Sequence, residues 1–139
     1  MSHTTRRKTA MRNPDLIKAA VAKIPGAKVL GVGEVKHFSE NSKGLRVELP
    51  GYRYPITIDT ATGTVSSDTY SGRWGNPELL DKLAQNYGVE AARAEAEQRR
   101  AKFATETLDD GSIKCTITIG GGLEAEGGSP YGGTGAPML

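Results

Sequence analysis

The chain has few of the residues that build covalent cross-links and metal sites. Among its 139 residues there are one cysteine, Cys115, and two histidines, His3 and His37. A single cysteine cannot form a disulfide within one chain, which favours a reducing compartment, so we expect a cytoplasmic protein. A structural zinc site needs about four cysteine or histidine ligands. We therefore predict no metal and no other cofactor.

Long apolar runs are also missing. No stretch approaches the ~20 consecutive apolar residues that a membrane-spanning helix needs, so we predict no membrane association. The basic residues near the N-terminus lead into an amphipathic segment that contains Asp15 and Pro25. A secretory signal has an apolar run at that place, and we therefore expect no such signal.

Most of the chain lacks an excess of charge of either sign. Residues 1–12 hold four basic residues and no acidic one, whereas residues 120–139 hold two acidic residues and no basic one. The residues between these two segments include fourteen of each sign. A dedicated nucleic-acid-binding domain usually carries a broad basic surface, so the composition favours a different main role.

Three segments carry the signals of α-helices. The sequence Asn-Pro-Asp at 13–15 supplies a capping side chain, a proline suited to the first turn and an acidic residue at the positive helix end. An Asn-Pro pair at 76–77 repeats this start, and we expect Gly88 to end the second helix. The apolar spacing of the segment after Gly88 predicts a third helix. The expected helices cover 14–24, 77–87 and 90–101.

Strand signals fill much of the remaining sequence. Polar and apolar residues alternate at 113–119, where Cys115 lies on the apolar face and is expected to be a buried, unreactive side chain. Asp110-Gly111 and the turn that ends at Gly63 predict two hairpins. Weaker alternation in "SHTTRRKTAM" predicts an edge strand at the N-terminus, because basic side chains on an edge deter sheet-to-sheet aggregation.

Strands in adjacent runs, with helices between them, predict an α+β fold. We expect a mainly antiparallel sheet with about three helices packed on it. The chain is predicted to form a single domain over residues 1–119. Residues 120–139 are rich in glycine and have no hydrophobic period, so we expect a flexible tail.

No motif in the sequence points to catalysis. The nucleophile elbow Gly-x-Ser-x-Gly of serine hydrolases is absent. Gly31 and Gly33 lie in a predicted strand with no third glycine, which favours a bend or bulge over a phosphate loop. The carboxylates of Asp109 and Asp110 fall at a tight turn. We therefore predict no catalytic residue and no enzymatic activity for the chain on its own.

Three segments occur in an order that resembles a known family. They read "MSHTTRRKTAM", "RWGNPELLDKLAQNYG" and "TETLDDGSIKCTITI". Together they resemble the family typified by hypothetical chloroplast reading frame thirty-five, over roughly residues 1–119. Thr4 stands where that family usually has an aromatic residue, and Arg73 stands where an acidic residue often precedes the tryptophan.

The resemblance implies that the opening segment is the first strand of the domain. The family has no established activity. Its members are common in cyanobacteria, plastids, other bacteria and some phages, and they often lie near genes for ATPases of the AAA+ class. This genomic association implies an accessory or binding role.

Trp74 is the strongest candidate for contact with a partner. Tryptophan is enriched in binding hot spots, and the neighbouring Arg73 can bind a carboxylate through two hydrogen bonds. Gly72 and Gly75 leave this connection poor in side-chain cover. The alternative role for Trp74 is packing beneath the following helix, where it would fix the angle at which the chain enters that helix.

These observations support two function classes. The favoured one is a non-catalytic interaction protein with a protein partner, such as an adaptor for an AAA+ ATPase system or for a phage-associated assembly. The alternative is a small nucleic-acid-binding protein, in which basic residues near the N-terminus contact phosphates. No aromatic residues for base stacking are interleaved there. The basic residues of this alternative are Arg6, Arg7, Lys8 and Arg12.

Overall fold

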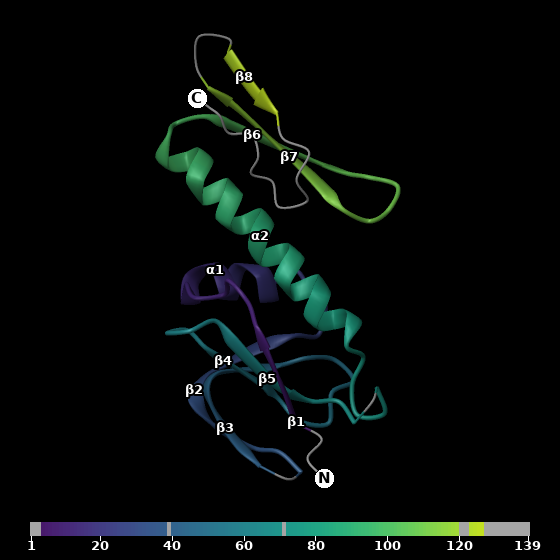
Figure 1. The fold of residues 1–139 in the computed structure, drawn as a ribbon. Coiled ribbons are helices and arrows are strands. Elements are labelled where there is room, and N and C mark those ends of the chain that lie inside the picture. Colours follow the sequence, from purple (N-terminus) through teal and green to yellow (C-terminus); the bar gives the residue numbers. More distant parts are fainter. Residues whose placement is uncertain (1–3, 39, 71, 120–122, 127–139) are drawn as a thin grey trace. The chain divides into compact units, whose positions relative to one another are not determined.

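Strands form much of the fold, and tight turns join some of them, as the turn-forming residues predict. The computed structural model describes residues 4–38, 40–70, 72–119 and 123–126. Within these residues the fold is α+β (Figure 1). The chain divides into two compact units, Met1–Ala84 (unit 1) and Gln85–Leu139 (unit 2). Each unit is described by itself, and the single domain expected over residues 1–119 stays a prediction.

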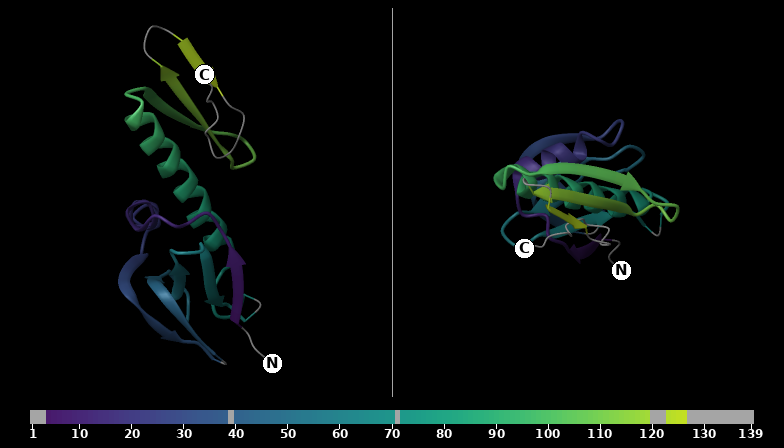
Figure 2. Two further views of the ribbon diagram at one scale, coloured as in Figure 1. Left: turned by 60° about the vertical axis from the view of Figure 1, so that its left-hand side comes forward. Right: turned by 90° about the horizontal axis from the view of Figure 1, so that it is seen from above.

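The predicted antiparallel pairing is confirmed, but the described strands form two sheets and not the one sheet that was predicted, because the three strands within residues 102–126 pair only with one another. Unit 1 contains a five-stranded antiparallel sheet. The strand order is β1-β5-β4-β3-β2. Helix α1 (Pro14–Val21) lies over one side of this sheet (Figure 1 and the left view of Figure 2). The strands are β1 (Thr4–Lys8), β2 (Lys28–Lys36), β3 (Asn41–Glu48), β4 (Ile56–Asp59) and β5 (Thr64–Asp68).

The N-terminal segment forms the predicted edge strand. β1 pairs antiparallel with β5, with Thr4 opposite Asp68 and Lys8 opposite Thr64. Ser2 and His3, the first two residues of the quoted segment "SHTTRRKTAM", lie outside the described residues. After β1, the chain stays close to the β4–β5 turn, because the Thr9 N–H and hydroxyl both donate to the Gly63 carbonyl at 3.0 and 2.6 Å.

Local residue chemistry explains how helix α1 begins and what it buries. The Asn13 side chain accepts hydrogen bonds from the backbone N–H groups of Asp15 and Leu16, which caps the first turn. Ile17 and Ala20 are fully buried. The helix ends at Val21, earlier than the predicted residue 24. The other buried apolar residues of unit 1 are Met11, Val21, Ile24, Val35, Leu45, Val47, Leu49, Ile56, Ile58, Val65, Leu80 and Leu83.

Glycine shapes the sheet at two places that the sequence marked. Gly63 takes a φ of +82° in the β4–β5 turn, and a Cβ atom there would lie 2.1 Å from the Thr9 carbonyl oxygen. Gly31 takes a φ of +97° at a register shift between β2 and β3. Gly31 is therefore part of a β-bulge in an edge strand, which confirms the structural interpretation of the Gly-x-Gly pair.

Unit 2 contains a three-stranded antiparallel sheet in the order β6-β7-β8 (Figure 2). Helix α2 (Glu78–Gln98) begins in unit 1, and its part from Gln85 onward belongs to unit 2. The strands are β6 (Lys102–Thr107), β7 (Ile113–Ile119) and β8 (Leu123–Glu126). A small core joins this part of α2 to the sheet: Val89, Ala92 and Cys115 are buried, with Phe103 and Ile113 packed against them.

Two predictions for this region are wrong. The helices expected at 77–87 and 90–101 form one helix, so the described residues contain two helices and not three. Gly88 does not end the helix, because an interior glycine costs only about 1 kcal/mol relative to alanine and good helix formers follow it. The helix ends where Arg100 takes a φ of +54° and the Ala101 N–H donates to the Ala96 carbonyl at 2.9 Å.

Part of the predicted tail has regular structure. β8 lies within residues 120–139 and pairs with β7, with Ile119 opposite Leu123. The rest of that predicted tail lies outside the described residues. Among the residues that the structure describes, no helix is both long and apolar enough to cross a membrane.

Candidate functional site

Three loops of unit 1 bring aromatic and arginine side chains together. One loop follows β2, the second joins β3 to β4, and the third joins β5 to α2. We call the cluster the aromatic–arginine surface, and it consists of Phe38, Arg53, Tyr54, Tyr70, Arg73 and Trp74.

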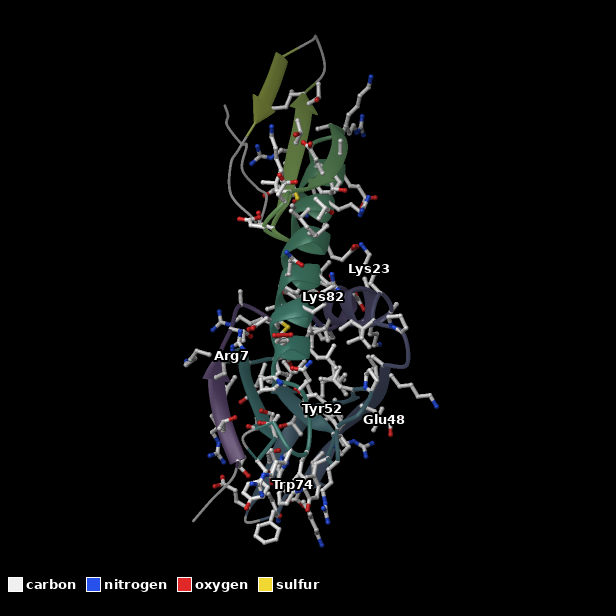
Figure 3. The ribbon with its side chains drawn as sticks, turned by 90° about the vertical axis from the view of Figure 1, so that its right-hand side faces the viewer. Arg7, Lys23, Glu48, Tyr52, Trp74 and Lys82 are labelled. Atoms are coloured by element: carbon white, nitrogen blue, oxygen red, sulfur yellow. The ribbon has the colours of Figure 1, made fainter. Side chains whose placement is uncertain are left out.

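Trp74 is the centre of this surface. Its ring centroid lies 4.6 Å from that of Tyr70, 5.5 Å from Phe38 and 5.8 Å from Tyr54. These distances are typical of favourable aromatic pairs. Trp74 is half-buried. Figure 3 places it at the end of the sheet where β1 begins, whereas Arg7 lies farther along β1. The tryptophan therefore belongs to a cluster of rings that remains open to solvent.

Backbone hydrogen bonds hold Trp74 between its neighbours. The Trp74 N–H donates to the Thr69 carbonyl at 2.8 Å, and the Arg53 N–H donates to the Trp74 carbonyl at 2.7 Å. In the loop between Thr69 and Trp74, Tyr70 takes a φ of +46°. Residues other than glycine rarely adopt this left-handed backbone conformation. Strain of this kind concentrates at functional sites, so the loop conformation agrees with a binding role.

Both arginines of the surface lie over aromatic rings. The guanidinium carbon of Arg53 is 4.9 Å from the Trp74 ring centroid and 5.8 Å from that of Tyr54. The guanidinium carbon of Arg73 is 5.2 Å from the Tyr70 ring centroid. Both arginines are exposed, and neither has a carboxylate partner among the described residues. The surface thus presents two oriented positive groups.

A buried polar cluster lies beside the surface. His37 Nε2 is 2.6 Å from Ser42 Oγ, and the Thr57 hydroxyl donates to the same Ser42 oxygen at 2.8 Å. Since Ser42 already accepts from Thr57, its own proton can be donated to a neutral His37 ring. Burial lowers the pKa of His37 from 6.5, and this effect outweighs the opposing charges of Asp68 and Glu40.

Two contacts connect the aromatic–arginine surface to this buried region, one through His37 and one through Asp68, whose charge acts on His37. The Phe38 N–H donates to Asp68 Oδ2 at 3.0 Å. The His37 ring meets the Tyr54 ring edge-on, with centroids 5.9 Å apart. This buried region therefore helps to fix the positions of Phe38 and Tyr54.

A serine hydrogen-bonded to a histidine is also the arrangement of an activated nucleophile. Here both side chains are buried, and Ser42 Oγ is engaged by Thr57 as well as by His37. A substrate atom needs space next to the nucleophile, which this enclosure does not give. No group of three or more metal-binding side chains occurs among the described residues.

Two of the predicted site residues fall in one place, and the structure adds four more. Arg73 and Trp74 both belong to the aromatic–arginine surface. The sequence interpretation missed Phe38, Arg53, Tyr54 and Tyr70. Tyr70 lies in the same loop as Trp74, whereas the other three come from loops that only the fold brings near it. A usable signal was present in the loop sequence "GYRYP", where two tyrosines flank an arginine between strands.

The basic residues near the N-terminus are not gathered in the same way. Side chains alternate along a strand, so Arg6 and Lys8 point to one face of β1 and Arg7 points to the other. Arg6 forms an ion pair with Glu40. Arg7 forms one with Asp81, with 2.6 Å between nitrogen and oxygen. Arg12 lies between β1 and α1.

Comparisons of the chain with protein-family models, with curated proteins and with solved structures found no match.

Proposed function

We propose that this protein is a non-catalytic interaction module that docks a protein partner on the aromatic–arginine surface. The observation that carries this proposal is the exposure of the cluster: Phe38 is 61% exposed although its ring packs against the half-buried Trp74. Large aromatic side chains left at the surface in a contiguous cluster are typical of interaction sites.

The composition of the surface supports docking. Tryptophan, tyrosine and arginine are the residues most enriched in interface hot spots. Here all three types lie within one cluster whose backbone is fixed by hydrogen bonds, so binding would order few side chains. Low ordering cost favours affinity.

The resemblance to the chloroplast reading-frame family supplies a class of partner. We propose that the module serves an AAA+ ATPase system or a phage-associated assembly, as the resemblance implies. The alternative, nucleic-acid binding through the N-terminal basic residues, has less support, because Arg6 and Arg7 are each engaged by a carboxylate of the chain. A salt-dependent mobility-shift assay with Arg6→Ala, Arg7→Ala and Lys8→Ala tests this alternative directly.

Quantitative affinity capture with the full chain tests the docking surface. Phe38→Ala and Trp74→Ala remove rings from it. Val32→Ala is the matched control, because Val32 is an apolar residue of unit 1 that is 81% exposed and lies in β2 outside the surface.

We expect Phe38→Ala and Trp74→Ala each to weaken binding of the captured protein by more than about tenfold, as hot-spot truncations do. Val32→Ala should bind like the unchanged chain. The affinities are measured by calorimetry with the captured protein after purification. Equal binding by all four proteins would refute docking at this surface.

A further inference from the structure

The aromatic–arginine surface has a charge and a shape that define its ligand more narrowly. We propose that it binds an acidic segment of a partner protein, with carboxylates against Arg53 and Arg73 and an apolar side chain against Phe38 and Trp74. This inference rests on the proposed function and adds the chemistry of the partner.

The two arginines are prepared to bind carboxylates. A guanidinium stacked on a ring keeps its hydrogen-bond donors in the plane and directed outward, where they match the two oxygens of a carboxylate. The guanidinium carbon of Arg53 lies 4.9 Å from the Trp74 ring centroid and that of Arg73 lies 5.2 Å from the Tyr70 ring centroid, close enough for such stacking. Stacking also reduces the side-chain freedom that binding would otherwise remove. Neither arginine has a carboxylate partner among the described residues.

The sign of the ligand charge follows from the neighbours of these rings. Several aromatic rings around a pocket can bind a cationic ligand, but here the chain's own Arg53 and Arg73 already lie over Trp74, Tyr54 and Tyr70. The nearby acidic side chains are not available to a cation. Asp68 is fully buried and accepts from the Phe38 N–H, and Glu40 is paired with Arg6. The surface therefore favours an anionic ligand.

A protein carboxylate fits the surface better than a nucleic acid does. Binding of single strands depends on a series of rings on which successive bases stack. Of the rings in this cluster only Phe38 is mostly exposed, because the others are half-buried against one another. One exposed ring beside two arginines suits an apolar side chain flanked by acidic residues.

The single tryptophan of the chain makes a direct test possible, because Trp74 lies inside the proposed site. Its fluorescence in the full-length protein is followed while capped peptides are added. The first probe is a hexapeptide with a glutamate on each side of a leucine-proline pair. The matched probe has glutamine in place of both glutamates. A thymidine decamer is the nucleic-acid probe.

We expect a saturable fluorescence change with the glutamate peptide, with a Kd at or below about 1 mM, and at least about tenfold weaker binding of the glutamine peptide. Arg53→Gln and Arg73→Gln should each weaken binding of the glutamate peptide by about tenfold. Arg53→Lys and Arg73→Lys should restore it only in part, since lysine lacks the planar donor pair. Arg99→Gln, in unit 2, is the control and should bind normally.

Three outcomes would overturn the inference. These are equal binding of the two peptides, absence of saturable binding by the glutamate peptide, and tighter binding of the thymidine decamer that is lost in Arg53→Gln.

The affinity of the captured protein for Trp74→Ala separates the proposal of docking at this surface from the proposal of an acidic partner segment. If that affinity falls while the two peptides bind equally, docking at the surface stands and the acidic partner does not. If it is unchanged, the docking proposal itself fails.

Discussion

The two units divide the charge and the apolar core of the chain unequally. Unit 1 contains thirteen basic and eight acidic residues, a net charge of +5, whereas unit 2 contains five basic and eight acidic residues, a net charge of −3. The overall value of +2 therefore hides two regions of opposite sign. Unit 1 also holds the aromatic–arginine surface, so its excess of positive charge adds to the local attraction for an anionic partner.

The cores differ as much as the charges do. In unit 1 every central strand contributes fully buried branched residues such as Val47, Ile56 and Ile58. Among the described residues, the buried apolar residues of unit 2 are fewer, and half of them are small: Ala92, Ala96 and Cys115, beside Tyr87, Val89 and Ile117. Small cores leave little margin of stability. A given loss of packing should therefore be a larger fraction of the stability of unit 2, while unit 1 provides the rigid support that its loops need.

The largest expected effect comes from a pair of glycines, one in each unit. Gly63 and Gly111 have φ angles of +82° and +89°, but a Cβ at Gly63 would meet the Thr9 carbonyl whereas nothing lies within 4 Å of one at Gly111. Gly111→Ala should cost about 1–2 kcal/mol of backbone strain. Gly63→Ala should cost about 2–5 kcal/mol, because overpacking is added to the strain.

Urea unfolding measures both costs. Trp74 fluorescence reports on unit 1, and far-ultraviolet circular dichroism reports on the whole chain. Equal losses of unfolding free energy for the two substitutions would show that the backbone near Thr9 can shift to accommodate a Cβ at residue 63 at little cost. The contrast between a tightly packed unit 1 and a more open turn in unit 2 would then be wrong.

An intermediate effect is expected at Cys115 in unit 2. The side chain is fully buried and belongs to the small core, so Cys115→Ser places a hydroxyl in an apolar site at a cost of about 1–3 kcal/mol. Cys115→Ala is the matched control, because it loses a similar volume without adding a polar group. The difference between their urea midpoints isolates the hydroxyl. A serine variant as stable as the alanine variant would contradict an apolar setting.

Cys115 also reports on the opening of unit 2. Burial raises the pKa of its thiol above 9.0, against the smaller opposing effect of Arg93. We expect slow reaction with a thiol reagent in the folded protein and fast reaction in urea. If thiol reactivity and Trp74 fluorescence change at the same urea concentration, the units unfold together as the predicted single domain would. Separate transitions would show two independently stable regions.

The smallest expected effect is a dependence on pH that separates the units. His37 has a lowered pKa in the folded state, so the unfolded chain binds more protons once the pH falls below about 6.5. Stability contributed by the neutral ring is thus present above that pH and is lost on acidification. Unit 1 should weaken as the pH falls below about 6.5, whereas unit 2, which contains no histidine, should not respond to the same step.

His37→Gln removes the titrating group and keeps a polar side chain. Its unfolding midpoint should therefore change less with acidification than that of the unchanged chain, when both are measured by Trp74 fluorescence. An identical pH profile for the two proteins would mean that His37 does not cause the acid sensitivity.

A second pH effect is expected at alkaline pH from Tyr52. Burial raises the pKa of its hydroxyl to about 12 in the folded protein, so the unfolded chain loses this proton first and unit 1 should weaken as the pH rises above about 10.

The sequence predicted those parts of the fold that depend on neighbouring residues. The β4–β5 and β6–β7 hairpins follow from turns at Gly63 and at Asp110-Gly111, where local hydrogen bonds and a positive φ decide the conformation. The predicted helix end at Gly88 was wrong. The cost of placing a glycine inside a helix is small, and the helical residues on both sides of Gly88 outweighed it. The true end of α2, at a left-handed Arg100, has no sequence signal.

The candidate site was predicted only in part, because sequence signals report mainly on residues that are neighbours in the chain. Arg73 and Trp74 could be selected from composition and neighbouring glycines. Tyr70 lies in the same loop, but Phe38, Arg53 and Tyr54 come from loops far away in the sequence, and their meeting with Trp74 depends on the strand order. The N-terminal basic residues show the opposite case, since their closeness in sequence suggested one patch and strand alternation separates them.

The strand order of unit 1 also has a consequence for the speed of folding. β1 pairs with β5, so that Thr4 must find Asp68 across most of the unit, whereas the β6–β7 hairpin of unit 2 joins residues such as Thr107 and Ile113. Pairings between distant residues form slowly, because the entropy of closing a long loop is lost before the contacts are gained. We expect the β6–β7 hairpin to form early and the β1 edge last. Until then β5 is itself an open edge to which other chains can pair.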